Sequence, residues 1–194
     1  MKNKYKALNS QYFSEGKYSI IPIRYEDRFS ILKWRNEQLY HLRQNNPLTE
    51  SDQENYFNTV INKLFEKDQP SQILFSYLQD EECIGYGGLV HINWIDKNAE
   101  ISFIMDTKLE KEHFSMHWKM FLKLIEQVAF KELKLYKIFT FAFDIRPHVF
   151  APIEDSGFVK EATLKSHSFF SGVYKDVIIH SKFNTFNAML ETEA

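Results

Sequence analysis

One stretch of the sequence, residues 99–134, constrains the fold more than any other. It opens with the apolar and aromatic run A-E-I-S-F-I-M-D and continues with the polar segment T-K-L-E-K-E-H. It then becomes amphipathic, as F-S-M-H-W-K-M-F-L-K-L-I-E-Q-V-A-F-K-E-L-K, and a second aromatic strand is predicted at 136–143. Strand, loop, helix and strand in this order form a βαβ crossover. Ligands of open α/β sheets bind beside such a loop and helix N-terminus, so we expect the functional site there.

The bulk composition predicts a globular protein of one domain, residues 1–194, with a core at 18–182 between a short polar N-terminus and a C-terminal tail. Its length of 194 residues suits one domain, and 44% of the residues are hydrophobic. A net charge of -2 provides no basic surplus for nucleic acid. The polar N-terminus fits neither a signal peptide nor a membrane span, so we expect a cytoplasmic protein that binds no membrane.

The single cysteine, Cys83, has no disulfide partner and no metal-binding partner at ligand spacing. We therefore expect no metal cofactor, and we interpret Cys83 as a small buried residue of a strand.

The remaining segments predict strands and helices on both sides of the crossover. We expect a strand at 18–23, a helix at 27–42 that carries Phe29, Leu32 and Tyr40 on one side, and a second helix that Thr49 or Ser51 caps. Two hairpins follow from the apolar runs 73–78 with 83–92 and 158–168 with 173–181. Gly85, Gly87 and Gly88 lie inside one strand, which indicates either close approach of another backbone or a tight bend.

This order predicts an α+β fold. Its central sheet is mixed and mostly antiparallel, with one parallel crossover between the fourth and fifth strands and helices on both faces.

Four short motifs give the chain a resemblance to a known superfamily. They are A-E-I at 99–101, G-F at 157–158, W-R-N at 34–36 and the closing F-F-S-G-V-Y-K-D-V-I-I-H at 169–180. In this order and spacing the sequence resembles the GNAT superfamily of acetyl-CoA-dependent N-acetyltransferases over residues 18–182. The closing pattern is similar to members that acetylate amino-sugar nucleotides or ribosomal-protein N-termini.

The resemblance implies that acetyl-CoA binds between the fourth and fifth strands. A backbone N–H of the fourth strand would polarise the thioester carbonyl, and N–H groups at the start of the long helix would hold the pyrophosphate. No acyl-enzyme forms, because the amine attacks the thioester directly. The residues that the resemblance assigns to the cofactor are Phe103, Ile104, Met105, Lys111, His113, Phe114, Ser115, Met116, Arg146 and Phe150.

Two places depart from the family pattern. The phosphate loop of the family usually reads Q/R-x-x-G-x-G/A, whereas residues 110–116 read E-K-E-H-F-S-M and contain no glycine. The family usually has N-x-x-S after the fifth strand, and here Arg146 and Val149 stand in these places. The tyrosine that often serves as the general acid in the family is replaced by Ile153. Either the loop is rebuilt, or it is a solvated charged segment.

Two residues are candidates for the base that takes the proton of the attacking ammonium. Glu100 is the first, because the glutamate of A-E-I has this role in several family members. His91, at the end of the third strand, is the second. Asp144 and His148 close the mouth of the fifth strand and are weaker candidates. Each of these residues also has an ordinary structural interpretation.

The first two helices and the final hairpin are expected to bind the acceptor, through Trp34, Arg35, Arg43, Phe169 and Phe170. Arg35 and Arg43 would share one helix face and hold a diphosphate, or would pair with Glu26 and Glu37; Trp34 is alternatively a core residue.

The favoured function is acetyl transfer from acetyl-CoA to a small amine, and an amino-sugar nucleotide is the favoured acceptor. Acetylation of protein or peptide N-termini and a GNAT-like binding or regulatory module without catalysis are the alternatives. The sequence leaves the oligomeric state open, a homodimer included.

Overall fold

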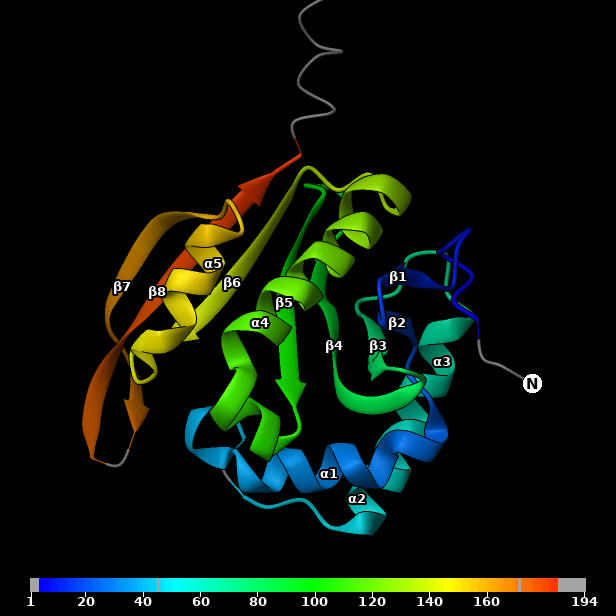
Figure 1. Cartoon of the computed structure of the whole chain (residues 1–194), viewed down its shortest axis with the longest axis horizontal. Coiled ribbons are helices and arrows are strands. Elements are labelled where there is room, and N and C mark those ends of the chain that lie inside the picture. Colours follow the sequence, from blue (N-terminus) through cyan, green and yellow to red (C-terminus); the bar gives the residue numbers. More distant parts are fainter. Residues whose placement is uncertain (1–3, 45, 171, 185–194) are drawn as a thin grey trace, which may run out of the picture.

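The computed structural model describes residues 4–44, 46–170 and 172–184. Its centre is an eight-stranded sheet in the order β1-β2-β3-β4-β5-β6-β8-β7 (Figure 1). All neighbouring strands are antiparallel except β5 and β6, which confirms the predicted mixed sheet with one parallel crossover. The strands are β1 Phe13–Glu15, β2 Tyr18–Pro22, β3 Ile73–Gln79, β4 Glu82–Asn93, β5 Asn98–Met105, β6 Lys137–Phe143, β7 Val159–Phe170 and β8 Val173–Phe183.

The helical segments cover both faces of the sheet. Successive residues of a strand point to opposite faces, and Gly87 of β4 lies against Phe121 of α4, while its neighbour Tyr86 lines a cavity with Ile31 of α1 and Phe57 of η3. The segments are η1 Tyr25–Asp27, α1 Arg28–Glu37, η2 Leu39–His41, α2 Glu50–Tyr56, η3 Phe57–Ile61, α3 Asn62–Phe65, α4 Thr107–Glu126, η4 Gln127–Glu132, η5 Pro147–Val149 and α5 Phe150–Asp155.

Close packing of two backbones explains the glycines of β4. A Cβ atom built on Gly87 would lie 2.2 Å from the carbonyl oxygen of Ser102, and one on Gly88 would lie 2.0 Å from that of Ile73. Of the two interpretations given above, close backbone approach is therefore the right one.

The start of the long helix was predicted wrongly. The polar segment 107–113 is helical and belongs to α4, whose N-cap Asp106 accepts hydrogen bonds from the backbone N–H groups of Lys108 and Leu109. The expected loop survives as a kink at His113, which has φ -134° and ψ 17°. An aspartate that caps the first turn favours helix in a polar segment, whatever the apolar pattern of that segment.

The first helix is also shorter than predicted. It ends at Glu37, and residues 39–41 form the separate turn η2, so Arg43 lies outside the helix that carries Arg35. Phe29 and Tyr40, expected on one side with Leu32, are exposed, and the residues that α1 buries are Ile31, Leu32 and Trp34. The strand β1 was not predicted, whereas Thr49 is the N-cap of α2, as expected.

Within residues 4–44, 46–170 and 172–184, none of the helices has the length and apolar character needed to cross a membrane.

Candidate active site

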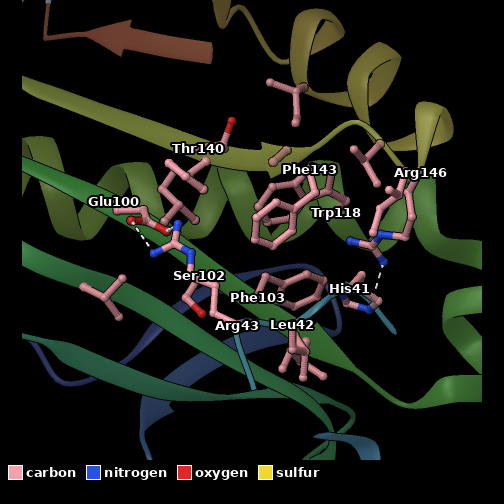
Figure 2. Close-up of a pocket in the computed structure, with 18 of the residues that line it drawn as sticks. His41, Leu42, Arg43, Glu100, Ser102, Phe103, Trp118, Thr140, Phe143 and Arg146 are labelled. Atoms are coloured by element: carbon pink, nitrogen blue, oxygen red, sulfur yellow. Dashed lines mark hydrogen bonds and ion pairs between the residues drawn. The ribbon is translucent and has the colours of Figure 1, made fainter. Parts of the chain in front are cut away.

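The two parallel strands of the crossover separate where the site was predicted. Their pairing ends at Glu100 and Phe139, although β5 continues to Met105 and β6 to Phe143. Beyond that point the facing backbone edges of the two described strands have no strand partner. A cavity of about 400 Å³ lies here and is lined by both strands, α4 and the segment after β6 (Figure 2). This opening can receive an extended chain that carries amide groups, since its edges present backbone donors and acceptors.

Two buried polar atoms beside this cavity have no hydrogen-bond partner in the described chain. They are Nε1 of Trp118 on α4 and Oγ1 of Thr140 on β6. Their residues are only 6% and 4% exposed. Buried N–H and O–H groups are nearly always satisfied, so these two atoms are candidate donors to a polar group in the opening. The pantetheine arm that the resemblance implies is an extended chain with two amides.

Stacked aromatic rings form one wall of the opening. The ring centroid of Phe103 on β5 lies 5.2 Å from that of Trp118 and 4.3 Å from that of Phe121, in near-parallel planes. Phe121 is fully buried, so the wall rests on the core. It gives the cavity one rigid apolar side.

Glu100 lies where β5 and β6 separate, and its carboxylate joins two other predicted residues. Nη2 of Arg43 donates to Oε1 at 2.9 Å, and Nδ1 of His91 lies 3.0 Å from Oε2. The side chain of Glu100 is 12% exposed, whereas that of His91 is 67% exposed. Arg43 also covers the ring of Phe141 at 3.9 Å. Figure 2 shows the Arg43–Glu100 pair at one side of the cavity.

A β-bulge positions His91. The register between β4 and β5 shifts between Val90 and Asn93, and His91 has φ 51°. Bulges re-aim side chains and are frequent next to active sites. If Nδ1–H donates to Glu100, Nε2 of His91 is the ring nitrogen that remains as an acceptor.

A second charged cluster lies at the carboxyl end of the opening. Nη1 of Arg146 donates to Oε1 of buried Glu110 at 3.1 Å, and it lies 3.2 Å from Nε2 of His41. Nε2 of His148 is 3.5 Å from the same carboxylate oxygen. Burial, followed by the charge of Arg146, lowers the pKa of His41 to about 3, so its ring is neutral, and its Nε2 also lies 3.2 Å from Oε1 of Gln38. Burial also lowers the pKa of Arg146.

The cofactor residues implied by the resemblance divide into two groups. Phe103, Ile104, Phe114 and Arg146 line the cavity. The other six do not: Met105 is buried in the core, Phe150 stacks on His180, and Lys111, His113, Ser115 and Met116 are exposed on α4. The helical turn of residues 107–112 explains this outcome, because it replaces the loop that was expected to surround the phosphates.

The predicted acceptor residues divide in the same way. Arg35 and Arg43 line the cavity, but neither pairs with Glu26 or Glu37, so that alternative is wrong. The structure does not bring three other residues to the cavity. Trp34 is 4% exposed and donates to Asp106, Phe169 projects outward, and Phe170 packs on Phe143. The core interpretation of Trp34 is therefore correct.

Sequence reasoning missed several residues that line the cavity, among them His41, Leu42, Trp118, Thr140 and Phe143. The last two lie in the carboxyl half of β6, where the rule that placed the site at the crossover also applies. Trp118 falls at helical spacing in the apolar stripe of the long helix, a pattern that predicts a core residue. Its indole N–H was the signal to examine, since a buried tryptophan usually finds an acceptor.

Cys83 does not contribute a nucleophile. It lies in β4, half-buried, and burial raises the pKa of its thiol to about 12. The thiol is therefore protonated at neutral pH.

Comparisons with known proteins agree with this geometry. The model of the Acetyltransferase (GNAT) domain family matches residues 20–179. A solved structure of spermidine N-acetyltransferase from Vibrio cholerae in complex with CoA and spermine is similar, with a TM-score of 0.77 and 20% identity over 88% of this chain and 98% of that one.

A dodecameric structure of the spermidine N-acetyltransferase from the same organism, in an intermediate state, has a TM-score of 0.72 and 19% identity over 89% of this chain and 97% of that one. These likenesses show a shared fold. No curated protein matches the chain.

The family match covers more than half of the sequence, the sheet is that of the family, and the strands separate where an acetyl donor fits. The chain belongs to the GNAT acetyltransferases, it is an acyltransferase, and its acyl donor is acetyl-CoA.

Proposed function

We propose that this chain transfers the acetyl group of acetyl-CoA to the primary amine of a small acceptor, with Glu100 and His91 removing the proton of the ammonium. The observation that carries the proposal is the position of this pair at the point where β5 and β6 separate. An amine held there would face the opening that fits the pantetheine arm.

Acetyl-CoA supplies an activated acetyl group, and the residues of the chain supply position and proton transfer. The amine nitrogen forms the new bond to the acetyl carbon, the bond from that carbon to sulfur breaks, and the thiol of CoA is released. Only the unprotonated amine has the lone pair for this attack. The proton must therefore leave first.

The two members of the pair have different roles in this proposal. Both carboxylate oxygens of Glu100 are already occupied, because Arg43 donates to each of them and Oε2 also lies 3.0 Å from Nδ1 of His91. His91 is exposed towards the acceptor side, and its Nε2 is free to accept when Nδ1–H donates. We therefore assign proton removal to His91 and its orientation to Glu100. Direct removal by Glu100, the first expectation from the sequence, is the competing assignment.

Phe103, Trp118 and Thr140 are proposed to contact the pantetheine arm. Trp118 and Thr140 would donate to its carbonyl groups, and the ring of Phe103 would support its carbon chain. For the phosphates we propose the kink of α4, where the second helical segment begins after His113, with Lys111 and His113 beside it.

Several amines are candidates for the acceptor. The closing hairpin motif favours an amino-sugar nucleotide, and peptide N-termini are the alternative from the same motif. The two solved structures of similar fold reported above are those of spermidine N-acetyltransferases. The amino-sugar nucleotide, the peptide N-terminus and spermidine each carry a primary amine, so each possibility is an amine acetylation. Membership of an acyltransferase family argues against the remaining alternative, a non-catalytic module.

The test combines binding with turnover. Acetyl-CoA at 100 times its Kd should raise the free energy of unfolding by about 2.7 kcal/mol, measured as a rise in Tm. CoA release should then be followed with a panel of amino-sugar nucleotide, dipeptide and spermidine. Absence of both stabilisation by millimolar acetyl-CoA and acceptor-dependent CoA release would refute the proposal.

A further inference from the structure

A second cavity adjoins the one between the strands. It has a volume of about 350 Å³ and lies between the sheet and the segments α1, α2 and η3. Four residues, Arg35, Gln72, Val90 and Ser102, line both cavities. Its walls include apolar side chains such as Ile31 and Phe57. They also include the phenolic groups of one tyrosine of α2 and one tyrosine of β4. An acceptor whose amine lies at Glu100 can therefore extend into this second cavity past Arg35.

Arg35 is a partly buried cation that no carboxylate of the described residues neutralises. Its Nε and Nη2 donate to Oε1 of Gln44 at 2.9 and 2.6 Å, and its Nη1 donates to the hydroxyl of Tyr86 at 2.6 Å. Both partners are neutral. The two other arginines of the cavities are paired, Arg43 with a glutamate of β5 and Arg146 with one of α4.

An unpaired cation away from water is unfavourable, and a guanidinium is always charged. Its planar fork matches the oxygens of a carboxylate or a phosphate. We propose that Arg35 binds an anionic group of the acceptor in the second cavity, so that the acceptor is a primary amine that also carries a carboxylate or a phosphate. This inference rests on the proposed function.

The charges of the two cavities disfavour a polyamine. Of the described residues that line them, Glu100 and Asp52 are the acidic ones. Glu100 is already bonded to Arg43, and the Oδ2 atom of exposed Asp52 accepts from the backbone and hydroxyl of Thr49. The additional ammonium groups of spermidine would therefore approach the cation Arg35, and exposed Asp52 is the one described acidic lining residue that is not paired with an arginine.

The experiment compares acceptors that differ only in the anion. Glucosamine 6-phosphate is paired with glucosamine, a dipeptide with its C-terminal amide, and spermidine is included as the polycation. We expect kcat/KM, measured by CoA release, to be at least about tenfold higher for the anionic member of at least one pair. The phosphate and carboxylate pairs distinguish the two kinds of anion.

Arg35→Gln should lower kcat/KM for the anionic member of the pair towards that of its neutral counterpart and so remove this preference, and Arg35→Lys should restore part of it. Arg28→Gln is the matched control. Arg28 lies on the same helix, pairs with Glu54 and lines neither cavity, so its loss should leave the preference unchanged. The inference would be overturned if the wild type had equal kcat/KM for the anionic and neutral members of both pairs. A preference for the anion that survives Arg35→Gln would also overturn it, and so would the highest kcat/KM with spermidine.

Failure of the inference differs from failure of the proposed function. Turnover of neutral amines or spermidine without an anion preference refutes only the role of Arg35. If no acceptor is turned over, the rise in Tm decides. With CoA present, glucosamine 6-phosphate or the dipeptide should stabilise the wild type more than its neutral counterpart and should lose this advantage in Arg35→Gln. No difference in either pair would refute the anionic subsite.

Discussion

The proposed proton transfer depends on His91 and Glu100, whose Nδ1 and Oε2 atoms lie 3.0 Å apart. The contact alone does not say which of them takes the proton, but their surroundings differ. Glu100 is nearly buried and bonded to Arg43, whereas His91 projects from a bulge with one ring nitrogen free. The pair therefore resembles a base and its orienting partner, an arrangement that recurs in enzymes with a general base.

Substitution of each residue should separate these roles. His91→Asn is suitable because asparagine tolerates the positive φ of this position. It should lower kcat/KM at neutral pH by about 10²–10³-fold, the range of a general base, with recovery at high pH, where the amine is already unprotonated. Glu100→Gln should lower it by about tenfold, because the amide oxygen can still accept from Nδ1–H.

The pH profile of kcat/KM and the KM for acetyl-CoA provide the measurement. The loss in His91→Asn should appear in kcat/KM for the acceptor, with KM for acetyl-CoA nearly unchanged. The opposite ranking, a larger and pH-dependent loss in Glu100→Gln with little effect of His91→Asn, would make the carboxylate the base.

Among the elements, β4 holds the site together although it contributes few functional groups. Its glycines let the backbones of β3 and β5 pack closely against it, and its bulge positions the side chain of His91. The opening between β5 and β6 thus depends on a strand that sits firmly against β5. A side chain introduced into β4 should disturb both stability and the geometry of the site.

Gly87→Ala tests the close approach. The new methyl group would lie 2.2 Å from the carbonyl oxygen of Ser102 and 2.9 Å from the ring of Phe121. Overpacking of this kind costs about 1–3 kcal/mol, occasionally more, and the fall in the free energy of unfolding can be measured with urea. Gly16→Ala, where no atom lies within 4 Å, is the control and should cost about 1 kcal/mol through its positive φ. A loss in Gly87→Ala no larger than that in Gly16→Ala would show that β4 and β5 move apart enough to accommodate the methyl group.

The helix α4 shows where element prediction from sequence fails. Its apolar stripe from Phe114 onwards was evident, but the preceding segment has mostly charged residues and reads as a loop by periodicity. The physical signal was local: Asp106 caps the first turn, and Glu110 is buried by its pair with Arg146. A long-range ion pair of this kind leaves no pattern in the sequence.

At the scale of the whole molecule, the described strands other than β1 and the crossover could be predicted, because alternation, turns and the long helix are local patterns. Glu100, His91, Arg35 and Arg43 could be placed near one site through the resemblance to the family. Their pairing could not, since Arg43 reaches Glu100 from 57 positions away in the chain. Nor could the unpartnered atoms of Trp118 and Thr140, which depend on the separation of β5 from β6.

The buried histidine His41 links the charged cluster at the carboxyl end of the opening to the stability of the whole fold. Its pKa is lowered to about 3 in the folded chain, whereas an exposed histidine of the unfolded chain has a pKa of about 6.5. Below pH 6.5 the unfolded chain therefore binds the proton more readily. The contribution of neutral His41 is complete above pH 6.5 and is lost progressively as the pH falls towards 3.

His41→Gln should reduce the dependence of unfolding free energy on pH between about 6.5 and 4. The wild type should lose up to about 1.4 kcal/mol per pH unit through this residue, and the variant should have a shallower slope, measured by urea unfolding at several pH values. Glutamine can still accept from Arg146. His167→Gln, at an exposed position of β7, is the control and should keep the wild-type slope. If the slopes of His41→Gln and wild type coincide, His41 is not held neutral by the fold, and Arg146 must find its acceptor elsewhere in the cluster.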